Sequence, residues 1–171
     1  SDVCSSDLFK LVATVTAQEE VGERGALIAA KQVNPDLAIV FEGCPADDTA
    51  ETPEMIQSAM GKGPMLRYFD VSMITNPEFQ EYALEIAKIN KIPVQVSVRS
   101  GGGTNGMAIT QVQGAPTIVV GIPVRYAHTP HCYVDFQDYQ AAKELVIQLI
   151  KNLDADKIQA LVQPLSKEWN K

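Results

Sequence analysis

The fold is decided by residues 9–33, FKLVATVTAQEEVGERGALIAAKQV, in which an apolar run, a pair of acids and a helical pattern follow one another. Residues 9–16 are almost continuously apolar and β-branched, which predicts a buried strand of the kind found in parallel sheets. Residues 23–33 are mostly good helix formers, and the Asn34-Pro35 pair ends this helix. A buried strand that leads into a helix is the repeating unit of a layered α/β domain.

The rest of the chain continues this alternation. Strands are expected at residues 37–41, 92–98 and 117–122, and helices at residues 76–90 and 139–153, with a peripheral helical remainder. A polar segment at residues 44–60 and a glycine-rich segment at residues 100–106 are expected to be loops.

Composition limits the classes of protein to which the chain can belong. With 171 residues and 46% hydrophobic content, it is long enough for one domain with a full core. Its net charge of -7 argues against a nucleic-acid surface, which needs concentrated positive charge. No apolar run approaches the ~20 residues of a membrane span. Cys4, Cys44 and Cys132 show no metal-binding or redox spacing, which fits a reducing, cytoplasmic compartment, and the last two are interpreted as packing residues.

Side chains able to bind metal follow three of the expected strands: Glu19 and Glu20 after the first, Glu42 after the second and His128 after the last. The carboxyl ends of strands carry the chemistry of open α/β sheets. Carboxylates with imidazole suit zinc, manganese or cobalt better than calcium. Two such ions ~3.5–4 Å apart can activate a water, while a free carboxylate takes its proton. The competing interpretations are a solvated acidic turn and a structural histidine.

Other polar positions near these side chains leave alternatives open. Arg125 either orients a substrate carboxylate or carbonyl, or braces its own loop. Gly103 lies in a glycine-rich loop without a phosphate-binding fingerprint, so close approach of the backbone to the site is the better explanation. Asp47 or Asp48 is an alternative metal ligand, and His131 is expected at the rim of the site.

Three blocks of sequence resemble, in order, the signature of the M42 family of metallo-aminopeptidases. They are residues 16–26, TAQEEVGERGA, residues 102–109, GGTNGMAI, and residues 114–130, GAPTIVVGIPVRYAHTP. Together they span nearly everything after residue 8. The resemblance implies a zinc-peptidase-like α/β fold, a layered domain with a mostly parallel, mixed central sheet flanked by helices. It also implies removal of N-terminal residues from peptides by a homo-oligomeric enzyme.

The resemblance carries over position by position. Glu19 would be the general base, and Glu20, Glu42 and His128 would be metal ligands. The cofactors would be two divalent metal ions, zinc or cobalt, with manganese as a further candidate. Arg125 and Gly103 are the residues expected to contact the peptide substrate.

The chain also departs from the family pattern. Glu42 stands where the family usually has aspartate, Asn105 replaces the loop aspartate, and Thr110 stands where a histidine is often found. These changes affect substrate choice more than the type of reaction. The family's upstream histidine and its bridging aspartate have no counterpart before Phe9.

Residues 1–8 resemble a translated sequencing adapter and are interpreted as a non-native segment. Residues 9–171 are then a partial, N-terminally truncated catalytic domain, which we expect to bind metal poorly and to be inactive alone. The alternatives are another metal-dependent amide hydrolase, such as a deacylase or an M20-like peptidase, and a catalytically inactive fragment.

Overall fold

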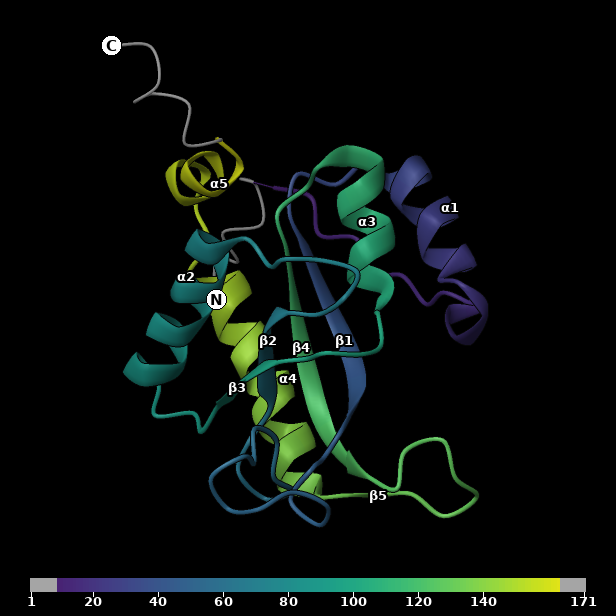
Figure 1. The fold of residues 1–171 in the computed structure, drawn as a ribbon. Helices are drawn as coiled ribbons and strands as arrows, with labels where there is room; N and C mark the ends of the chain where they lie inside the picture. Colours follow the sequence, from purple (N-terminus) through teal and green to yellow (C-terminus); the bar gives the residue numbers. More distant parts are fainter. Residues whose placement is uncertain (1–8, 164–171) are drawn as a thin grey trace, which may run out of the picture.

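The computed structural model describes residues 9–163, and the predicted adapter segment lies outside them. A central sheet is covered by helices on both faces (Figure 1). The elements are, in order, the 3-10 turn η1 (Glu19–Val21), α1 (Arg24–Val33), β1 (Ala38–Pro45), β2 (Met65–Phe69), α2 (Pro77–Ile89), β3 (Gln95–Val98), α3 (Asn105–Gln113), β4 (Thr117–Arg125), β5 (Tyr133–Val134), α4 (Phe136–Lys151) and α5 (Ala155–Val162).

The sheet is mixed. Its strand order is β1-β4-β2-β3, and the short β5 pairs with β4. β1 runs parallel to β4 and β2 runs parallel to β3, whereas β2 and β4 are antiparallel. The predicted layered α/β domain with a mostly parallel, mixed central sheet is therefore confirmed.

Side chains of β4 alternate between two apolar clusters because successive residues of a strand point to opposite faces of the sheet. Ile118 and Val120 pack into the larger cluster with residues of α2 and α4, such as Phe79 and Leu145. Val119 faces the other way and packs near α3. Burial of each large apolar side chain contributes ~1.5–3 kcal/mol before the entropy of ordering is counted. These contacts fix the frame on which the site residues sit.

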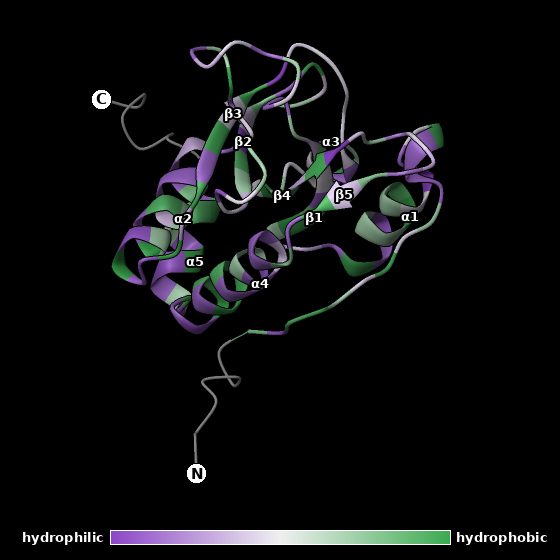
Figure 2. Cartoon of the chain, turned by 90° about the horizontal axis from the view of Figure 1, so that it is seen from below, coloured by the Kyte–Doolittle hydropathy of each residue, from purple (hydrophilic) through white to green (hydrophobic). Residues whose placement is uncertain are grey.

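The stretch predicted as the first strand differs from the prediction. Residues 9–16 form no strand, and Val15 is fully exposed. Figure 2 shows this largely hydrophobic stretch running along the outside of the molecule before α1. A strand needs a neighbour for its backbone groups, and the stretch has none among residues 9–163. It is anchored at its end, where the Gly25 N–H donates to the Ala17 carbonyl (3.0 Å).

Other boundaries also differ. β1 and β4 run longer than predicted because they pair in register as far as Pro45 and Val124. Glu42 consequently lies inside a strand rather than after it. β3 starts later than predicted, after Pro93, which has no N–H to donate to a ladder. The helix α3 was not predicted, and it begins inside the glycine-rich segment, where the Thr104 hydroxyl accepts from the Gly106 N–H (3.1 Å).

Candidate active site

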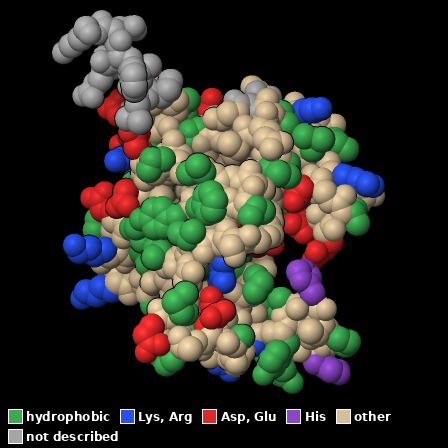
Figure 3. All heavy atoms as spheres, viewed as in Figure 1, with side chains coloured by type: hydrophobic (Ala, Val, Ile, Leu, Met, Phe, Trp, Pro, Cys, Tyr) green, Lys and Arg blue, Asp and Glu red, His purple; other side chains and the backbone are tan. Residues whose placement is uncertain are grey.

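A cleft of about 450 Å³ lies where η1, β1, the glycine-rich loop and the loop after β4 meet. The charged and histidine side chains of its lining come from η1, the start of α1, β1, β2, the end of β3 and the loop after β4: Glu19, Glu20, Glu23, Glu42, Arg67, Arg99 and His128. Acidic and histidine side chains adjoin at one edge of the face shown in Figure 3. The cleft therefore gathers the four side chains for which the sequence predicted chemistry.

Glu20 and His128 are in direct contact. The Glu20 Oε1 atom lies 3.2 Å from the His128 Nε2 atom, and both side chains are more than two-thirds exposed. An imidazole nitrogen and a carboxylate oxygen at this separation are two donor atoms of the kind that zinc and similar ions prefer.

Both loops that carry this pair have left-handed backbone conformations at residues other than glycine. Gln18 (φ 62°) and Glu23 (φ 49°) flank the acidic pair, and Tyr126 (φ 58°) precedes His128 (φ 63°). Such conformations cost free energy in non-glycine residues and cluster at functional sites. Of the six such residues among residues 9–163, two lie within three positions of Glu20 and two lie in the loop of His128.

Glu42 projects from the middle of β1 and is half-buried. Burial raises its pKa to about 7, the charges of Glu19 and Glu20 add to the rise, and Arg67 opposes it. Burial also raises the pKa of Glu19, with further contributions from Glu20 and Glu23. Four glutamates line the cleft, against two arginines, so the carboxylates outnumber the positive side chains. A divalent cation bound there would stabilise the ionised carboxylates.

The donor chemistry of the cleft fits a divalent metal ion as part of a ligand set. Glu20 and His128 are already adjacent, and Glu42 and Glu19 line the same cleft. Within residues 9–163, however, no three histidine, cysteine or acidic side chains are close enough together to hold a metal. Of the three residues predicted to converge, Glu20 and His128 are in contact, and Glu42 lines the same cleft without contacting them.

Two arginines in the cleft wall were not predicted. Arg67 on β2 is 4% exposed, and its two terminal nitrogens donate to Asp70 (2.8 Å) and to the Cys44 sulfur (3.1 Å). Arg99, just after β3, donates to Asp47 (2.9 Å) and to the Pro45 carbonyl (2.9 Å). For Arg67 the sequence did contain a signal, because it is the single charged residue of the apolar stretch MLRYF. A charged residue in such a stretch is seldom buried without a partner, so its position indicates a specific role.

Arg125 lies outside the lining of the cleft. It forms a two-point ion pair with Asp48, with Nε to Oδ1 at 3.0 Å and NH2 to Oδ2 at 2.7 Å. Of the two alternatives for Arg125, bracing the loop is the one that this contact supports.

Asp47 accepts from the Gln57 and Ser58 N–H groups as well as from Arg99. Both aspartates therefore hold the segment between β1 and β2, and neither lines the cleft.

Gly103 is in close contact with the acidic wall. A methyl group at this position would lie 3.1 Å from the Ser72 Oγ atom and 3.2 Å from the Glu23 Oε1 atom. The predicted close approach of backbone to the site thus has a steric basis here.

His131 is exposed and lies outside the lining of the cleft. Cys44 is buried as predicted, whereas the packing role predicted for Cys132 is wrong because this residue is exposed on the same loop.

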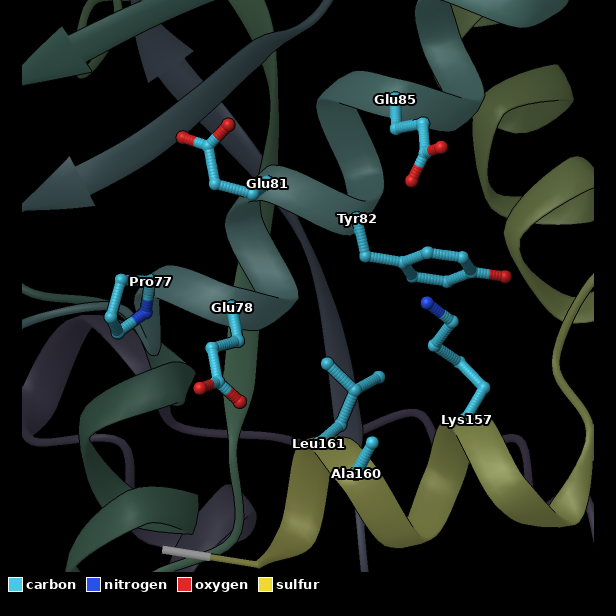
Figure 4. A pocket seen from close by; sticks show the side chains of 8 residues that line it. All are labelled: Pro77, Glu78, Glu81, Tyr82, Glu85, Lys157, Ala160 and Leu161. Atoms are coloured by element: carbon cyan, nitrogen blue, oxygen red, sulfur yellow. The ribbon is translucent and has the colours of Figure 1, made fainter. Parts of the chain in front are cut away.

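A second hollow, of about 600 Å³, lies between α2 and α5 (Figure 4). Three acids of α2 line it, Glu78, Glu81 and Glu85, and the Lys157 Nζ atom lies 5.1 Å from the centre of the Tyr82 ring. It contains no histidine. A lysine over an aromatic ring and acids along one helix face are common features of a solvated helix pair, so this hollow is the weaker candidate for chemistry.

Comparison with known proteins identifies the family. The sequence model of the family described as M42 glutamyl aminopeptidase matches residues 5–145. The chain belongs to the M42 family. The resemblance predicted from the three sequence blocks is thereby confirmed.

Relatives of this M42 chain are named as aminopeptidases. The lysyl aminopeptidase of Pyrococcus furiosus is 34% identical over 155 residues, which cover 86% of this chain and 41% of that enzyme. The crystal structure of a TET aminopeptidase from Thaumarchaeota archaeon SCGC AB-539-E09 is 40% identical, with a TM-score of 0.82, and the match covers 86% of this chain and 42% of that one. The Pyrococcus horikoshii TET1 peptidase, described as able to assemble into a tetrahedron or a large octahedral shell, is 28% identical with a TM-score of 0.69 over 81% and 40%. The chain thus spans about two fifths of the length of these relatives.

No helix within residues 9–163 combines the length and apolar character that crossing a membrane requires.

Proposed function

We propose that this M42 chain carries part of the active site of a metal-dependent aminopeptidase that removes N-terminal residues from peptides. The observation that carries the proposal is the contact between Glu20 and His128, which lies in the same cleft as Glu19 and Glu42. Family membership supports the reaction type, because the relatives are named as aminopeptidases.

Glu20, Glu42 and His128 are the residues that would hold metal ions, two divalent ions in all, with zinc or cobalt preferred and manganese a further candidate. Residues outside this chain would complete the ligand set, since residues 9–163 bring no three candidate ligands together. When bound, these ions supply Lewis-acid chemistry at the scissile carbonyl.

Glu19 is the proposed general base. Burial raises its pKa, and the neighbouring charges of Glu20 and Glu23 raise it further. A carboxylate whose pKa has moved toward neutral pH accepts a proton from the attacking water and returns it to the leaving amine more readily than an ordinary one. Glu20, the next residue, contacts His128 instead, so the two adjacent acids have separate tasks.

The glycine-rich loop forms the proposed substrate side of the cleft. Gly103 packs closely against Ser72 and Glu23, which brings the backbone of this loop up to the acidic wall of the cleft. Arg125 is assigned to bracing, because Asp48 occupies its guanidinium group. The complete protein is proposed to act as a homo-oligomer, as described for the related TET1 peptidase.

The test compares the complete gene product with its E19Q variant. We expect hydrolysis of aminoacyl p-nitroanilides that stops on chelation and returns with zinc or cobalt. E19Q should lower kcat by about 10²–10⁴-fold, the usual contribution of a general base, with metal content by mass spectrometry unchanged. E78Q, which alters an acid of the second hollow, is the matched control and should behave as wild type.

Two results would contradict the proposal. Loss of metal in E19Q would make Glu19 a ligand rather than the base. Turnover of N-acylated substrates in preference to those with a free amine would indicate a deacylase.

A further inference from the structure

An exposed aromatic surface lies beside the loop that carries His128. It consists of four rings that follow the end of β4, each 46–63% exposed: Tyr126, Tyr133, Phe136 and Tyr139. The aromatic residues of the core, Phe79 and Tyr82, are by contrast at most 6% exposed. The loop between β4 and β5 projects beyond the sheet in Figure 1, and hydrophobic side chains lie beside the two histidines in Figure 3. Exposed apolar patches of this kind mark interaction sites in soluble proteins.

The four rings form two packed pairs. The Tyr126 and Tyr133 rings meet edge to face with their centres 5.9 Å apart, and the Phe136 and Tyr139 rings stack with their centres 5.9 Å apart. Both pairs are attached to regular structure, because Tyr133 belongs to β5, which pairs with β4, and Phe136 is the first residue of α4. The rings are therefore held in place before a partner arrives, which lowers the entropic cost of binding.

The aromatic surface carries few charged groups. Residues 126–139 contain no lysine or arginine, and their acids are Asp135 and Asp138. The Asp135 carboxylate accepts from the Gln137 N–H (2.7 Å) at the start of α4. Asp138 is buried and accepts from the N–H groups of Gly61 and Gly63 (2.7 Å each). Because the chain has a net charge of -7, two copies meet at the lowest electrostatic cost on a surface such as this one.

The exposed ring area suits the centre of a protein interface. A tyrosine or phenylalanine buries about 150–250 Å² when it is fully covered, so four rings at about half exposure present about 300–500 Å² together. A stable interface covers about 800 Å² on each partner, with a core enriched in tyrosine and phenylalanine and a polar rim. The four rings can therefore supply the core of such an interface, and the polar residues around them can supply the rim.

Parts of the complete protein outside this chain have another place to attach. β1 lies at one end of the strand order, and residues 9–16 pair with no strand among residues 9–163. Both offer backbone groups to a further strand. The aromatic surface instead offers side chains, since β5 is already paired with β4. This difference favours a contact between the folded surfaces of two copies over a continuation of the sheet.

We propose that the aromatic surface is a contact between two copies of this chain, related by twofold symmetry. The inference rests on the proposed function, which includes a homo-oligomer, and it assigns a face to one contact of that oligomer. In a twofold contact the same patch lies on both sides, so rings meet rings. His128 lies in the loop between Tyr126 and Tyr133, so the contact adjoins the candidate active site.

The test is F136E in the complete gene product, with I89K as the matched control. Phe136 and Ile89 are 63% and 66% exposed, and each new charge suits its helix, an acid in the first turn of α4 and a base in the last turn of α2. In F136E two like charges are brought together across the contact. Sedimentation velocity over a range of concentrations should show the dissociation constant of the assembly raised at least about tenfold, since juxtaposed like charges oppose association. I89K should assemble as wild type does.

A second variant, Y133S/Y139S, removes two rings without adding a charge, so a folding defect peculiar to F136E leaves the test intact. It should weaken assembly in the same direction. Unchanged assembly of the folded variants would overturn the inference, and a lower unfolding temperature with unchanged assembly would show that another part of the same chain covers the rings. An equal loss of assembly in I89K would overturn it as well, because the effect would not belong to this face.

Hydrolysis of aminoacyl p-nitroanilides by the same wild-type protein separates this inference from the proposed reaction. A wild-type monomer that hydrolyses them would overturn the contact and leave the reaction in place. A wild-type assembly that dissociates in F136E, but that hydrolyses no aminoacyl p-nitroanilide, would support the contact and overturn the reaction.

Discussion

Glu20 and His128 are 108 positions apart in the chain, yet the Oε1 atom of one lies 3.2 Å from the Nε2 atom of the other. The two residues sit in short turns with left-handed backbone conformations around them, at Gln18, Glu23 and His128 itself. Neither side chain is buried, so packing does not hold the pair together. The contact therefore depends on the backbone conformations of the two turns.

Replacing His128 should therefore weaken metal binding without unfolding the protein. H128A removes a donor atom but little buried surface, because the side chain is 73% exposed. We expect the affinity for zinc to fall by more than about tenfold, the lower limit for changes to groups that merely support a ligand. Competition with a chelator measures this loss in the complete gene product. H131A, on the same loop but outside the cleft, should bind zinc as wild type does, and equal losses in both variants would point to general damage to the loop.

The ion pair between Asp48 and Arg125 predicts a dependence of stability on pH. The hydrogen bonds from Arg125 hold the pKa of Asp48 below its usual range. A carboxyl group with a depressed pKa in the folded state stabilises that state above its unfolded pKa, ~3.9 for aspartate, and the contribution is lost as the pH falls through the folded value. D48N should thus be less stable than wild type at pH 7, with a difference that shrinks in strong acid. Urea unfolding at several pH values measures it, and a constant difference would assign the effect to packing.

The sequence indicated the local parts of this architecture better than the parts that depend on distant partners. α2 could be placed because Asn76, Pro77 and an early acid mark its start, and the Asn76 side chain does accept from the Phe79 N–H (2.8 Å). The stretch at residues 9–16 has equally clear strand composition, but a strand exists only when another strand pairs with it, and residues 9–163 offer none. The composition of a segment shows that it could form a strand, but it does not show whether another strand is available to pair with it.

At the site, too, the sequence indicated the residues with local signals but not those that depend on distant partners. The acids and the histidine could be selected because their types and order in the chain suggest metal chemistry. Arg67 could not be placed in the cleft, because its position there depends on Asp70 and Cys44, which only the folded chain brings together with it. The helix α3 was hidden by Gly102, Gly103 and Gly106, which indicate a loop when read singly, although the Thr104 cap is sufficient to start a helix.

Gly103 provides a steric test of the proposed substrate side of the cleft. In G103A the new methyl group would lie 3.1 Å from the Ser72 Oγ atom and 3.2 Å from the Glu23 Oε1 atom, so the loop must shift by a few tenths of an ångström. G101A, two residues earlier, meets nothing within 4 Å. We expect G103A to lower kcat/KM for aminoacyl p-nitroanilides by up to about tenfold, because small displacements of positioning groups slow a reaction disproportionately.

Thermal unfolding of the two glycine variants separates the site from the fold. Neither glycine has the left-handed backbone conformation that alanine resists, so both variants should unfold within a few degrees of wild type, as surface substitutions of ~0.5 kcal/mol do. A loss of kcat/KM in G103A with G101A unaffected would tie the loop to the substrate through its contact with Ser72 and Glu23. If G103A and G101A both keep the kcat/KM of wild type, peptides do not bind beside Gly103. The substrate would then be expected to bind on the wall of the cleft formed by the exposed Glu20 and His128.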